Sequence, residues 1–373
     1  MEAPFVAARL STVETGSMTS CSLYLSTAGG DWDQTRSLAV AAERLGYRAA
    51  WLMDNTAGWA GAPHETPLLE PWAAIPALAE ATDRIALGTL ATPPGRRHPA
   101  ILARQIATAD RISGGRVELT MGAGDEPQMY ELMGQPLLEP GQRIDQMVEE
   151  MTIMRSLWTQ PRTTYHGSFY DITDGVCEPK PETPIPLWIP LAWGKRRMPS
   201  VIARWADGFS VAPHLAPAAM VRSQIERVQR ACEDIGRDPM SLLSNRLVGV
   251  TLTDTAVEPA EAKRRLLATA DARTRQVMDS VGQYWRDILH PQWPDDVPAV
   301  YTFEDFYDVT EFHCVGTPEQ VAEQILAGVS ELGIAEVVVW PHGMLRSWEP
   351  SCVAAQADLV ERFAVEVMPL LEG

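Results

Sequence analysis

The sequence predicts an α/β fold, a (β/α)8 TIM barrel with insertions. Short apolar segments alternate with amphipathic helical segments eight times along the chain, and no change of composition divides it. The stretch 85–125 shows the pattern most clearly, because two apolar strands flank one amphipathic helix there. Such a βαβ unit places its two strands in parallel. A length of 373 residues suits one large barrel, although it would also accommodate two ordinary domains.

The expected strands are short apolar runs, and the expected helices carry apolar residues at helical spacing. Strands are expected at residues 22–25, 49–53, 85–87, 117–121, 187–192, 208–212, 242–252 and 336–340. Helices are expected at 34–45, 72–81, between 98 and 114, and at 126–134, 143–158, 199–205, 220–235, 261–281, 317–332 and 354–371. Gly46, Gly114 and Gly333 follow three of these helices, as helix-ending glycines do. Thr317 and Pro318 are typical of a helix start.

An open doubly wound sheet is the alternative fold. It would favour a phosphate-binding GxGxxG motif after the first strand, and Ser26-Thr27-Ala28-Gly29-Gly30 is not such a motif. We expect one barrel domain over residues 19–373, preceded by a loose leader at 1–18. Two regions look inserted: 160–185, which we expect to form a hairpin and a linker, and 255–312, a possible lid or subunit contact.

Composition narrows the class of function. A formal net charge of −18 argues against binding to nucleic acid or to an anionic membrane surface. No apolar run approaches the length of a membrane span, and no signal peptide is visible in residues 1–20. The five cysteines are an odd, dispersed set, so we expect reduced thiols in a cytoplasmic protein. The seven histidines show no metal-binding spacing, so we expect no metal.

The carboxyl ends of the expected strands are the place to look for a ligand, because parallel barrels bind ligands there. The second strand ends at Asp54-Asn55, with Trp59 close behind, which suits a planar ring and a hydrogen-bonding group beside it. An Asx turn with a packing tryptophan is the alternative interpretation. After the fourth strand, Gly124 would let a ligand approach the backbone, and Asp125 could donate a proton. A tight turn with an acidic helix cap is equally compatible.

A third candidate follows the fifth strand. Ala192-Trp193-Gly194-Lys195-Arg196 places cations between a strand end and a helix start in an otherwise acidic protein. This arrangement is typical of an anion site. A solvated run of surface charge is the alternative interpretation.

Several of these segments together resemble the bacterial-luciferase-like family of flavin and deazaflavin oxidoreductases. The resemblance covers most of residues 20–370 and is most specific in its central pair of motifs. The segments that carry it are WLMD at 51–54, LGT at 87–89, RHPAILA at 97–103, SGGRVELTMGAGD at 113–125, PLWIPLAWG at 186–194, ADGF at 206–209 and GTPEQVAEQI at 316–325. Within the family the chain is more similar to members that use coenzyme F420, an 8-hydroxy-5-deazaflavin.

The resemblance implies a barrel that binds the cofactor ring at its carboxyl rim. It places Asn55 where those members have a histidine and Asp125 where they have a glutamate, keeps Trp59 as their tryptophan, and implies a cis peptide between Leu90 and Ala91. The cofactor-binding residues expected on this basis are Asp54, Leu90, Ala91, Thr92, Gly124, Gln128, Ala192, Trp193, Gly194, Lys195 and Arg196. Asparagine is no general base at neutral pH, which favours reduction of a different substrate over alcohol oxidation.

Three functions remain open from the sequence. The first is a coenzyme F420-dependent oxidoreductase, expected to be a reductase and a homodimer, acting on a small organic metabolite. In it Asp125 would donate a proton, Asn55 would hold the hydride acceptor, and Trp59 would stack beside it. The second is a reduced-FMN-dependent monooxygenase on the same fold, with FMN in place of F420. The third is a flavin-binding barrel without catalysis.

Overall fold

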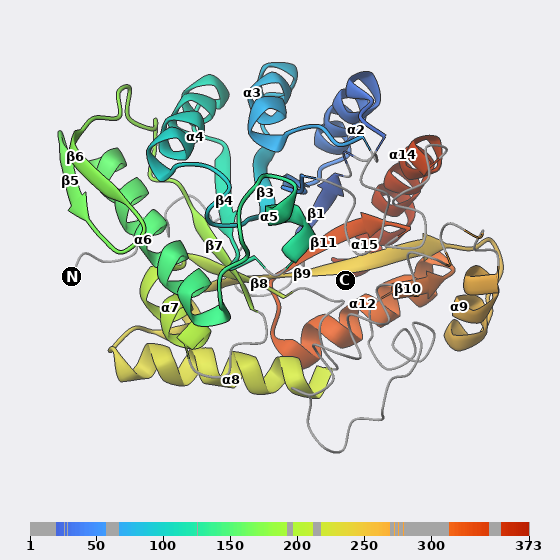
Figure 1. Ribbon diagram of the computed structural model, residues 1–373. Helices are drawn as coiled ribbons and strands as arrows, with labels where there is room; N and C mark the ends of the chain where they lie inside the picture. Colours follow the sequence, from blue (N-terminus) through green and yellow to red (C-terminus); the bar gives the residue numbers. More distant parts are fainter. Residues whose placement is uncertain are drawn as a thin grey trace.

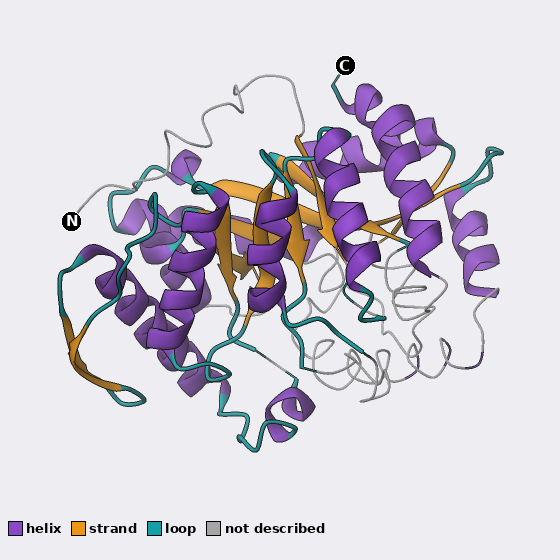
Figure 2. Ribbon diagram, turned by 90° about the horizontal axis from the view of Figure 1, so that it is seen from above, coloured by secondary structure: helices purple, strands orange, loops and turns teal. Residues whose placement is uncertain are grey.

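The computed structural model describes residues 20–25, 27, 29–56, 67–124, 126–191, 197–211, 218–268, 272, 275, 279, 313–342 and 352–372. Eight parallel strands in these ranges form a closed barrel in the order β9-β11-β1-β2-β3-β4-β7-β8, and β8 pairs back onto β9. The helices lie around the outside of the strands (Figures 1 and 2). The predicted (β/α)8 barrel is therefore confirmed.

The barrel strands are β1 (Ser20–Leu25), β2 (Ala49–Leu52), β3 (Ala86–Thr92), β4 (Val117–Met121), β7 (Leu187–Leu191), β8 (Gly208–Val211), β9 (Leu243–Leu252) and β11 (Glu336–Pro341). The helices after them are α2 (Trp32–Arg44), α3 (Pro71–Ala81), α4 (Pro99–Ser113), α5 (Pro127–Glu131), α6 (Pro140–Thr159), α7 (Arg197–Trp205), α8 (Ala218–Asp234), η2 (Pro239–Ser241), α9 (Pro259–Ala268), α12 (Pro318–Leu332), α14 (Cys352–Arg362), the π-helix η5 (Phe363–Val367) and α15 (Met368–Leu371). None of the helices in the described ranges is both long enough and apolar enough to cross a membrane.

Local signals start and end the helices as the sequence predicts. Thr317 caps α12 in a capping box with Gln320, so both side chains satisfy backbone N–H groups of the first turn. Gly114 ends α4 with φ +65° and Gly333 ends α12 with φ +64°, a conformation that glycine adopts without strain.

The structure differs from the prediction at two strands. An additional parallel strand, β10 (His313–Gly316), pairs with the second half of β9, whereas β8 pairs with its first half. Its four residues are too few to show an apolar pattern. β3 was expected to end at residue 87 but runs to Thr92, because its pairing with β4 resumes there after a shift of register. The leader 1–18 and most of the second half of the helix expected at 261–281 lie outside the described residues.

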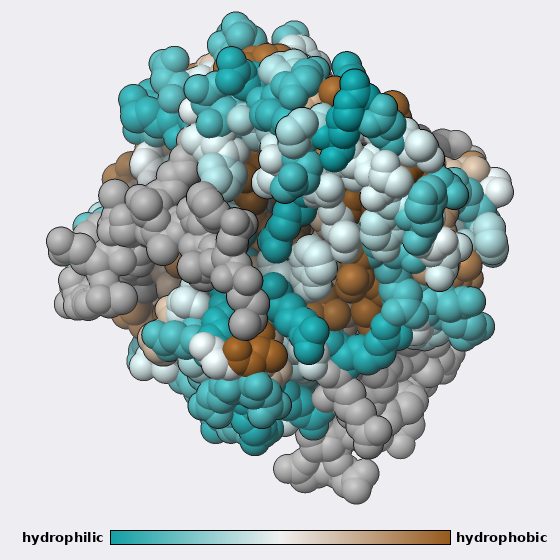
Figure 3. Space-filling view, turned by 90° about the vertical axis from the view of Figure 1, so that its left-hand side faces the viewer, coloured by the Kyte–Doolittle hydropathy of each residue, from teal (hydrophilic) through white to brown (hydrophobic). Residues whose placement is uncertain are grey.

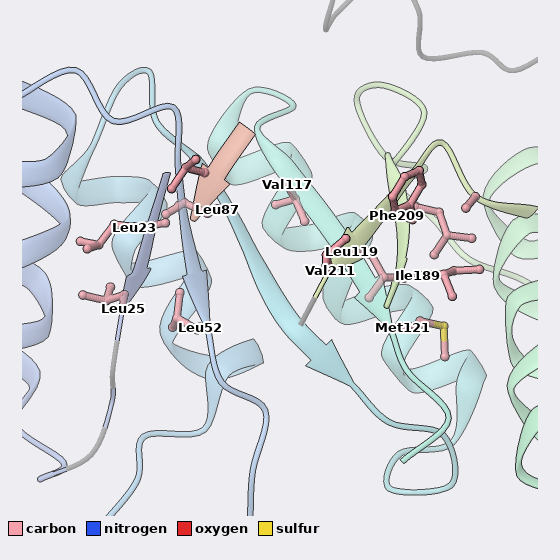
Figure 4. Packing of buried hydrophobic residues seen from close by; sticks show 14 of the residues in the cluster. Leu23, Leu25, Leu52, Leu87, Val117, Leu119, Met121, Ile189, Phe209 and Val211 are labelled. Carbon is pink, nitrogen blue, oxygen red and sulfur yellow. The ribbon is translucent and has the colours of Figure 1, made fainter. Parts of the chain in front are cut away.

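Apolar side chains lie on both sides of the barrel wall. Outward-facing side chains such as Leu23, Leu119 and Val211 pack against the helices (Figure 4). Inside the barrel, the rings of Trp51 and Trp188 meet edge to face at 5.9 Å. Gly88 and Gly208 make room for these rings: an added Cβ would lie 2.8 Å from the Trp51 ring and 2.6 Å from the Trp188 ring, respectively.

A polar group that we call the base cluster lies near the amino-terminal ends of the strands. It consists of Ser22, Arg48, Glu118, Trp188 and Glu336. Arg48 donates to Glu118 at 2.6 Å and lies 3.0 Å from a carboxylate oxygen of Glu336. Ser22 donates to Glu336, and Trp188 Nε1 donates to Glu118 at 2.8 Å. The Arg48 guanidinium therefore pairs with two buried carboxylates.

Residues 160–185 contain an antiparallel hairpin, β5 (Thr163–His166) and β6 (Asp171–Gly175), between α6 and β7. The hairpin lies beside α6 at the outer edge of the barrel (Figure 1). The face that carries it is mostly hydrophilic (Figure 3). Asp110 of α4 accepts backbone hydrogen bonds from Glu182 and Thr183 at 2.7 and 3.2 Å, which ties the segment after the hairpin to the barrel.

Candidate functional site

The carboxyl ends of β2 and β3 are joined by buried hydrogen bonds. Asp54, which follows β2 and is 1% exposed, accepts from Thr92 Oγ1 at 2.8 Å and from both terminal nitrogens of Arg97 at 2.7 and 2.9 Å. Trp72 Nε1 donates to Thr92 Oγ1 at 3.0 Å, and Arg97 also pairs with Glu70. We call Asp54, Glu70, Trp72, Thr92 and Arg97 the rim network. Its bidentate arginine–carboxylate pair fixes the direction of the segment after β2.

The segment between β3 and α4, residues 93–98, connects several parts of the rim, and we call it the β3 rim loop. Arg96, which is 9% exposed, donates to the Asp54 carbonyl oxygen and lies over the Tyr130 ring at 5.4 Å. Tyr130 of α5 donates to the Pro94 carbonyl oxygen at 3.0 Å. Thr56 donates to the Met129 carbonyl oxygen at 3.1 Å, so the segments after β2, β3 and β4 hold one another.

Leu90, Ala91 and Gly122 lie where the carboxyl ends of β3 and β4 meet. Leu90 and Ala91 are half-buried and lie in the register shift, so they take no part in the ladder with β4. The peptide that joins them is cis, which confirms that prediction. Across from them, a Cβ added to Gly122 would lie 3.5 Å from the Ala91 side chain, an ordinary contact distance. A bulge of this kind at a strand end leaves backbone groups available to a ligand.

Gly124 needs to be glycine for two reasons. Its φ is +68°, and an added Cβ would collide with the Tyr130 hydroxyl and lie 3.2 Å from Pro93. Arg143 of α6 donates to the Gly124 carbonyl oxygen. Gln128 lies half-buried on α5 directly after this segment.

The structure brings the described candidates together at one rim. Asp54 and Thr92 are in direct contact, and Leu90, Ala91 and Gly124 line the neighbouring strand ends. Asn55 is half-buried and its Nδ2 lies 2.8 Å from Met53 Sδ. The other candidates lie outside the described residues: Trp59, Asp125, Ala192, Trp193, Gly194, Lys195 and Arg196. In the described part of the chain, no group of three or more metal-ligating side chains could hold a metal ion.

Sequence reasoning missed Glu150 and Tyr170. Glu150 of α6 is 1% exposed, and its Oε1 accepts from Gly95 N at 2.7 Å and from the Tyr170 hydroxyl. Burial raises the pKa of Glu150 to about 7, against the opposing effects of these two hydrogen bonds and of Arg97. An acidic residue on the apolar face of a predicted helix was the one available signal for this group.

Comparisons with known proteins agree with this architecture. A family profile described as luciferase-like monooxygenase matches residues 15–336. The F420-dependent glucose-6-phosphate dehydrogenase of Amycolatopsis mediterranei is 30% identical over 209 residues, which cover 53% of this chain and 61% of that enzyme. The FMNH(2)-dependent dimethylsulfone monooxygenase of Pseudomonas putida is 27% identical over 356 residues, which cover 91% of this chain and 88% of that enzyme.

Solved structures show the same fold. An F420-dependent secondary alcohol dehydrogenase superposes with a TM-score of 0.73 at 19% identity, covering 95% of this chain and all of that one. The long-chain alkane monooxygenase LadA superposes with a TM-score of 0.69 at 17% identity, covering 95% of this chain and 91% of that one. Since the family profile spans most of the chain, the chain belongs to the luciferase-like monooxygenase family.

Proposed function

We propose that the protein is a coenzyme F420-dependent oxidoreductase that reduces a small organic metabolite. Two observations support it: the similarity to F420-dependent dehydrogenases, and the bulge of half-buried apolar residues, Leu90 and Ala91, at the end of β3. The bulge carries the proposal, because half-buried apolar side chains beside backbone groups outside the strand ladder suit the face of a planar ring. A homodimer in the cytoplasm stays a prediction from the sequence.

The described residues fit a deazaflavin. Leu90 and Ala91 would lie behind its ring, and Gly122 at the neighbouring strand end adds no side chain there. When bound, a deazaflavin supplies hydride transfer. The side chain of Asp54 is occupied by Thr92 and Arg97, so we propose that Asp54 acts by orienting the segment that holds Asn55. A phosphate would be held by the backbone of 192–194 with Lys195 or Arg196.

The types of the expected site residues support the reducing direction. Asn55 can orient a carbonyl or imine group by hydrogen bonding but cannot remove a proton at neutral pH. Asp125 is proposed to supply the proton that accompanies reduction, and Trp59 to contact the substrate. Alkenes, imines and carbonyl compounds are the substrate classes that match this assignment.

Equilibrium titration tests the proposal. We expect the purified protein to quench the fluorescence of F420 on binding, and to oxidise reduced F420 when an acceptor from these classes is present. We expect Asp125→Asn to bind F420 as the wild type does but to turn over about 10²–10⁴-fold more slowly. Absence of F420 binding at millimolar concentration would refute the proposed cofactor. Unchanged turnover of Asp125→Asn would remove the aspartate from the mechanism.

A reduced-FMN-dependent monooxygenase is the second candidate. The observation in its favour is the length of the alignment: the similarity to the dimethylsulfone monooxygenase extends over 88% of that enzyme. Alignments with three F420-dependent glucose-6-phosphate dehydrogenases extend over 58–70% of those enzymes. Binding of reduced FMN in preference to F420, with substrate-dependent oxygen consumption, would establish this alternative.

A further inference from the structure

The inserted hairpin is connected to the ligand-binding rim through one buried carboxylate. Tyr170 belongs to the turn between β5 and β6, Glu150 to α6, and Gly95 to the β3 rim loop. The hydroxyl of Tyr170 and the amide of Gly95 both donate to the same oxygen, Oε1 of Glu150. The hairpin is therefore connected to the β3 rim loop by two hydrogen bonds that share one acceptor, Glu150.

A second side chain of α6 completes this contact. Gln146, one helical turn before Glu150, donates from Nε2 to the Tyr170 hydroxyl at 3.0 Å. Gly95 has φ +80°, and an added Cβ would lie 3.1 Å from the Gln146 side chain, so the loop approaches the helix closely. We call Gln146, Glu150 and Tyr170 the Glu150 clamp.

The loop that the clamp holds is the one that organises the rim. Arg96 and Arg97 of this loop bind the carbonyl and the carboxylate of Asp54, and Pro94 accepts from Tyr130 of α5. The Tyr170 ring also meets the His98 ring edge to face at 5.6 Å, where the loop enters α4. Fixing Gly95 therefore fixes the direction of both arginines.

We propose that Glu150 is a positioning residue: its carboxylate, held by Tyr170 of the inserted hairpin, fixes the β3 rim loop and thereby sets the affinity of the barrel for its cofactor. The proposal rests on the proposed function, because it assigns the cofactor to this rim. It gives the hairpin insertion a role in ligand binding, although no residue of the hairpin needs to touch the ligand.

Neighbouring positions on α6 provide matched variants. Glu150→Ala removes the acceptor, whereas Glu150→Gln keeps an oxygen in its place. Glu149→Ala is the control, because Glu149 accepts backbone hydrogen bonds from Ser168 and Phe169 in the hairpin turn and none from the described rim loop. Tyr170→Phe removes the hydroxyl and keeps the ring against His98.

Hydrogen–deuterium exchange and cofactor titration together test the proposal. We expect Glu150→Ala to speed exchange in peptides that cover 93–98 and to weaken F420 binding about tenfold, the value of about one hydrogen bond. Glu150→Gln should restore both to within about threefold, since the amide oxygen can still accept a hydrogen bond. Glu149→Ala should change exchange in the hairpin turn alone. Tyr170→Phe should fall between Glu150→Ala and the wild type.

The contradicting outcomes are distinct. Unchanged loop exchange in Glu150→Ala, or an equal effect of Glu149→Ala on F420 affinity, would overturn the positioning role. If the wild type binds neither F420 nor FMN, the proposed function fails, and the assignment of the clamp to cofactor affinity fails with it. Loop exchange would then still show whether Glu150 holds the loop.

Discussion

At each end of the barrel one arginine pairs with two carboxylates, but the paired residues come from different structural elements. In the base cluster, Arg48 serves Glu118 and Glu336, whose side chains are 6% and 5% exposed. In the rim network, Arg97 serves Asp54, which is buried, and Glu70, whose side chain is 46% exposed. Each end therefore places one guanidinium between two carboxylates.

The difference lies in what holds the charged groups. In the base cluster both carboxylates belong to strands, and Arg48 directly precedes one, so the hydrogen-bonded ladder fixes their positions. The rim network draws most of its members from loops and helix starts, and these depend on side-chain contacts for their geometry. We propose that the base cluster acts on stability alone, whereas the rim network also sets the shape of the proposed binding site. The predictions below test this division.

The largest effect is expected at the base. Arg48→Met would leave two buried carboxylates without their cation and should lower the free energy of unfolding by about 3–5 kcal/mol. Because burial raises the pKa of Glu336, the penalty should shrink at lower pH as that carboxylate takes up a proton. Urea unfolding at several pH values measures this. F420 affinity of the folded fraction should not change, and a selective loss of binding would contradict the division.

The next effect concerns pH at the rim. The pKa of Glu150, about 7, exceeds its usual value of 4.5, so the folded protein holds a proton that the unfolded chain releases between these values. Stability from this group is present below pH 4.5 and is lost as pH rises through 7. The wild type should lose roughly 3 kcal/mol over this range relative to Glu150→Gln. If the unfolding free energies of the two proteins changed equally with pH across this range, the raised pKa of Glu150 would be contradicted.

Glycines at the two ends provide a matched pair. Gly88→Ala would force a methyl group against the Glu118 carbonyl oxygen and the Trp51 ring inside the barrel. Gly124→Ala would force one against the Tyr130 hydroxyl at the rim. We expect each to cost about 1–3 kcal/mol of unfolding free energy. Only Gly124→Ala should also weaken F420 binding, because Tyr130 must release Pro94. Thermal unfolding combined with titration separates the two effects, and equal binding losses would refute the assignment.

The sequence predicted what depends on local signals. The eight barrel strands follow from apolar runs, and the ends of α4 and α12 follow from Gly114, Thr317 and Gly333. The polar residue at the end of β2 was also identified, but its partner was not. Arg97 reaches Asp54 across 43 positions and Glu150 reaches Gly95 across 55, so only the folded barrel brings these pairs together. Periodicity carries no information about such contacts.

The smallest predicted effect falls on a single hydroxyl. Thr92→Val preserves shape but removes the acceptor of the buried Trp72 Nε1 and one donor to Asp54. An unsatisfied buried N–H group costs about 1–3 kcal/mol, and we expect the lower end because Arg97 still holds Asp54. Thr89→Val is the control, since the only side-chain contact described for Thr89 Oγ1 is with Thr92 Oγ1, at 2.9 Å.

Measured side by side, the two threonine variants decide whether the rim network acts on binding. Thr92→Val should weaken F420 binding by a factor of about three to ten, because Asp54 loses part of the support that orients the segment carrying Asn55. Thr89→Val should leave binding unchanged, because the bonds from Trp72 and to Asp54 remain. If both variants lose stability and neither loses affinity, the rim network would be structural in the same sense as the base cluster, and the difference between the two ends of the barrel would be one of position alone.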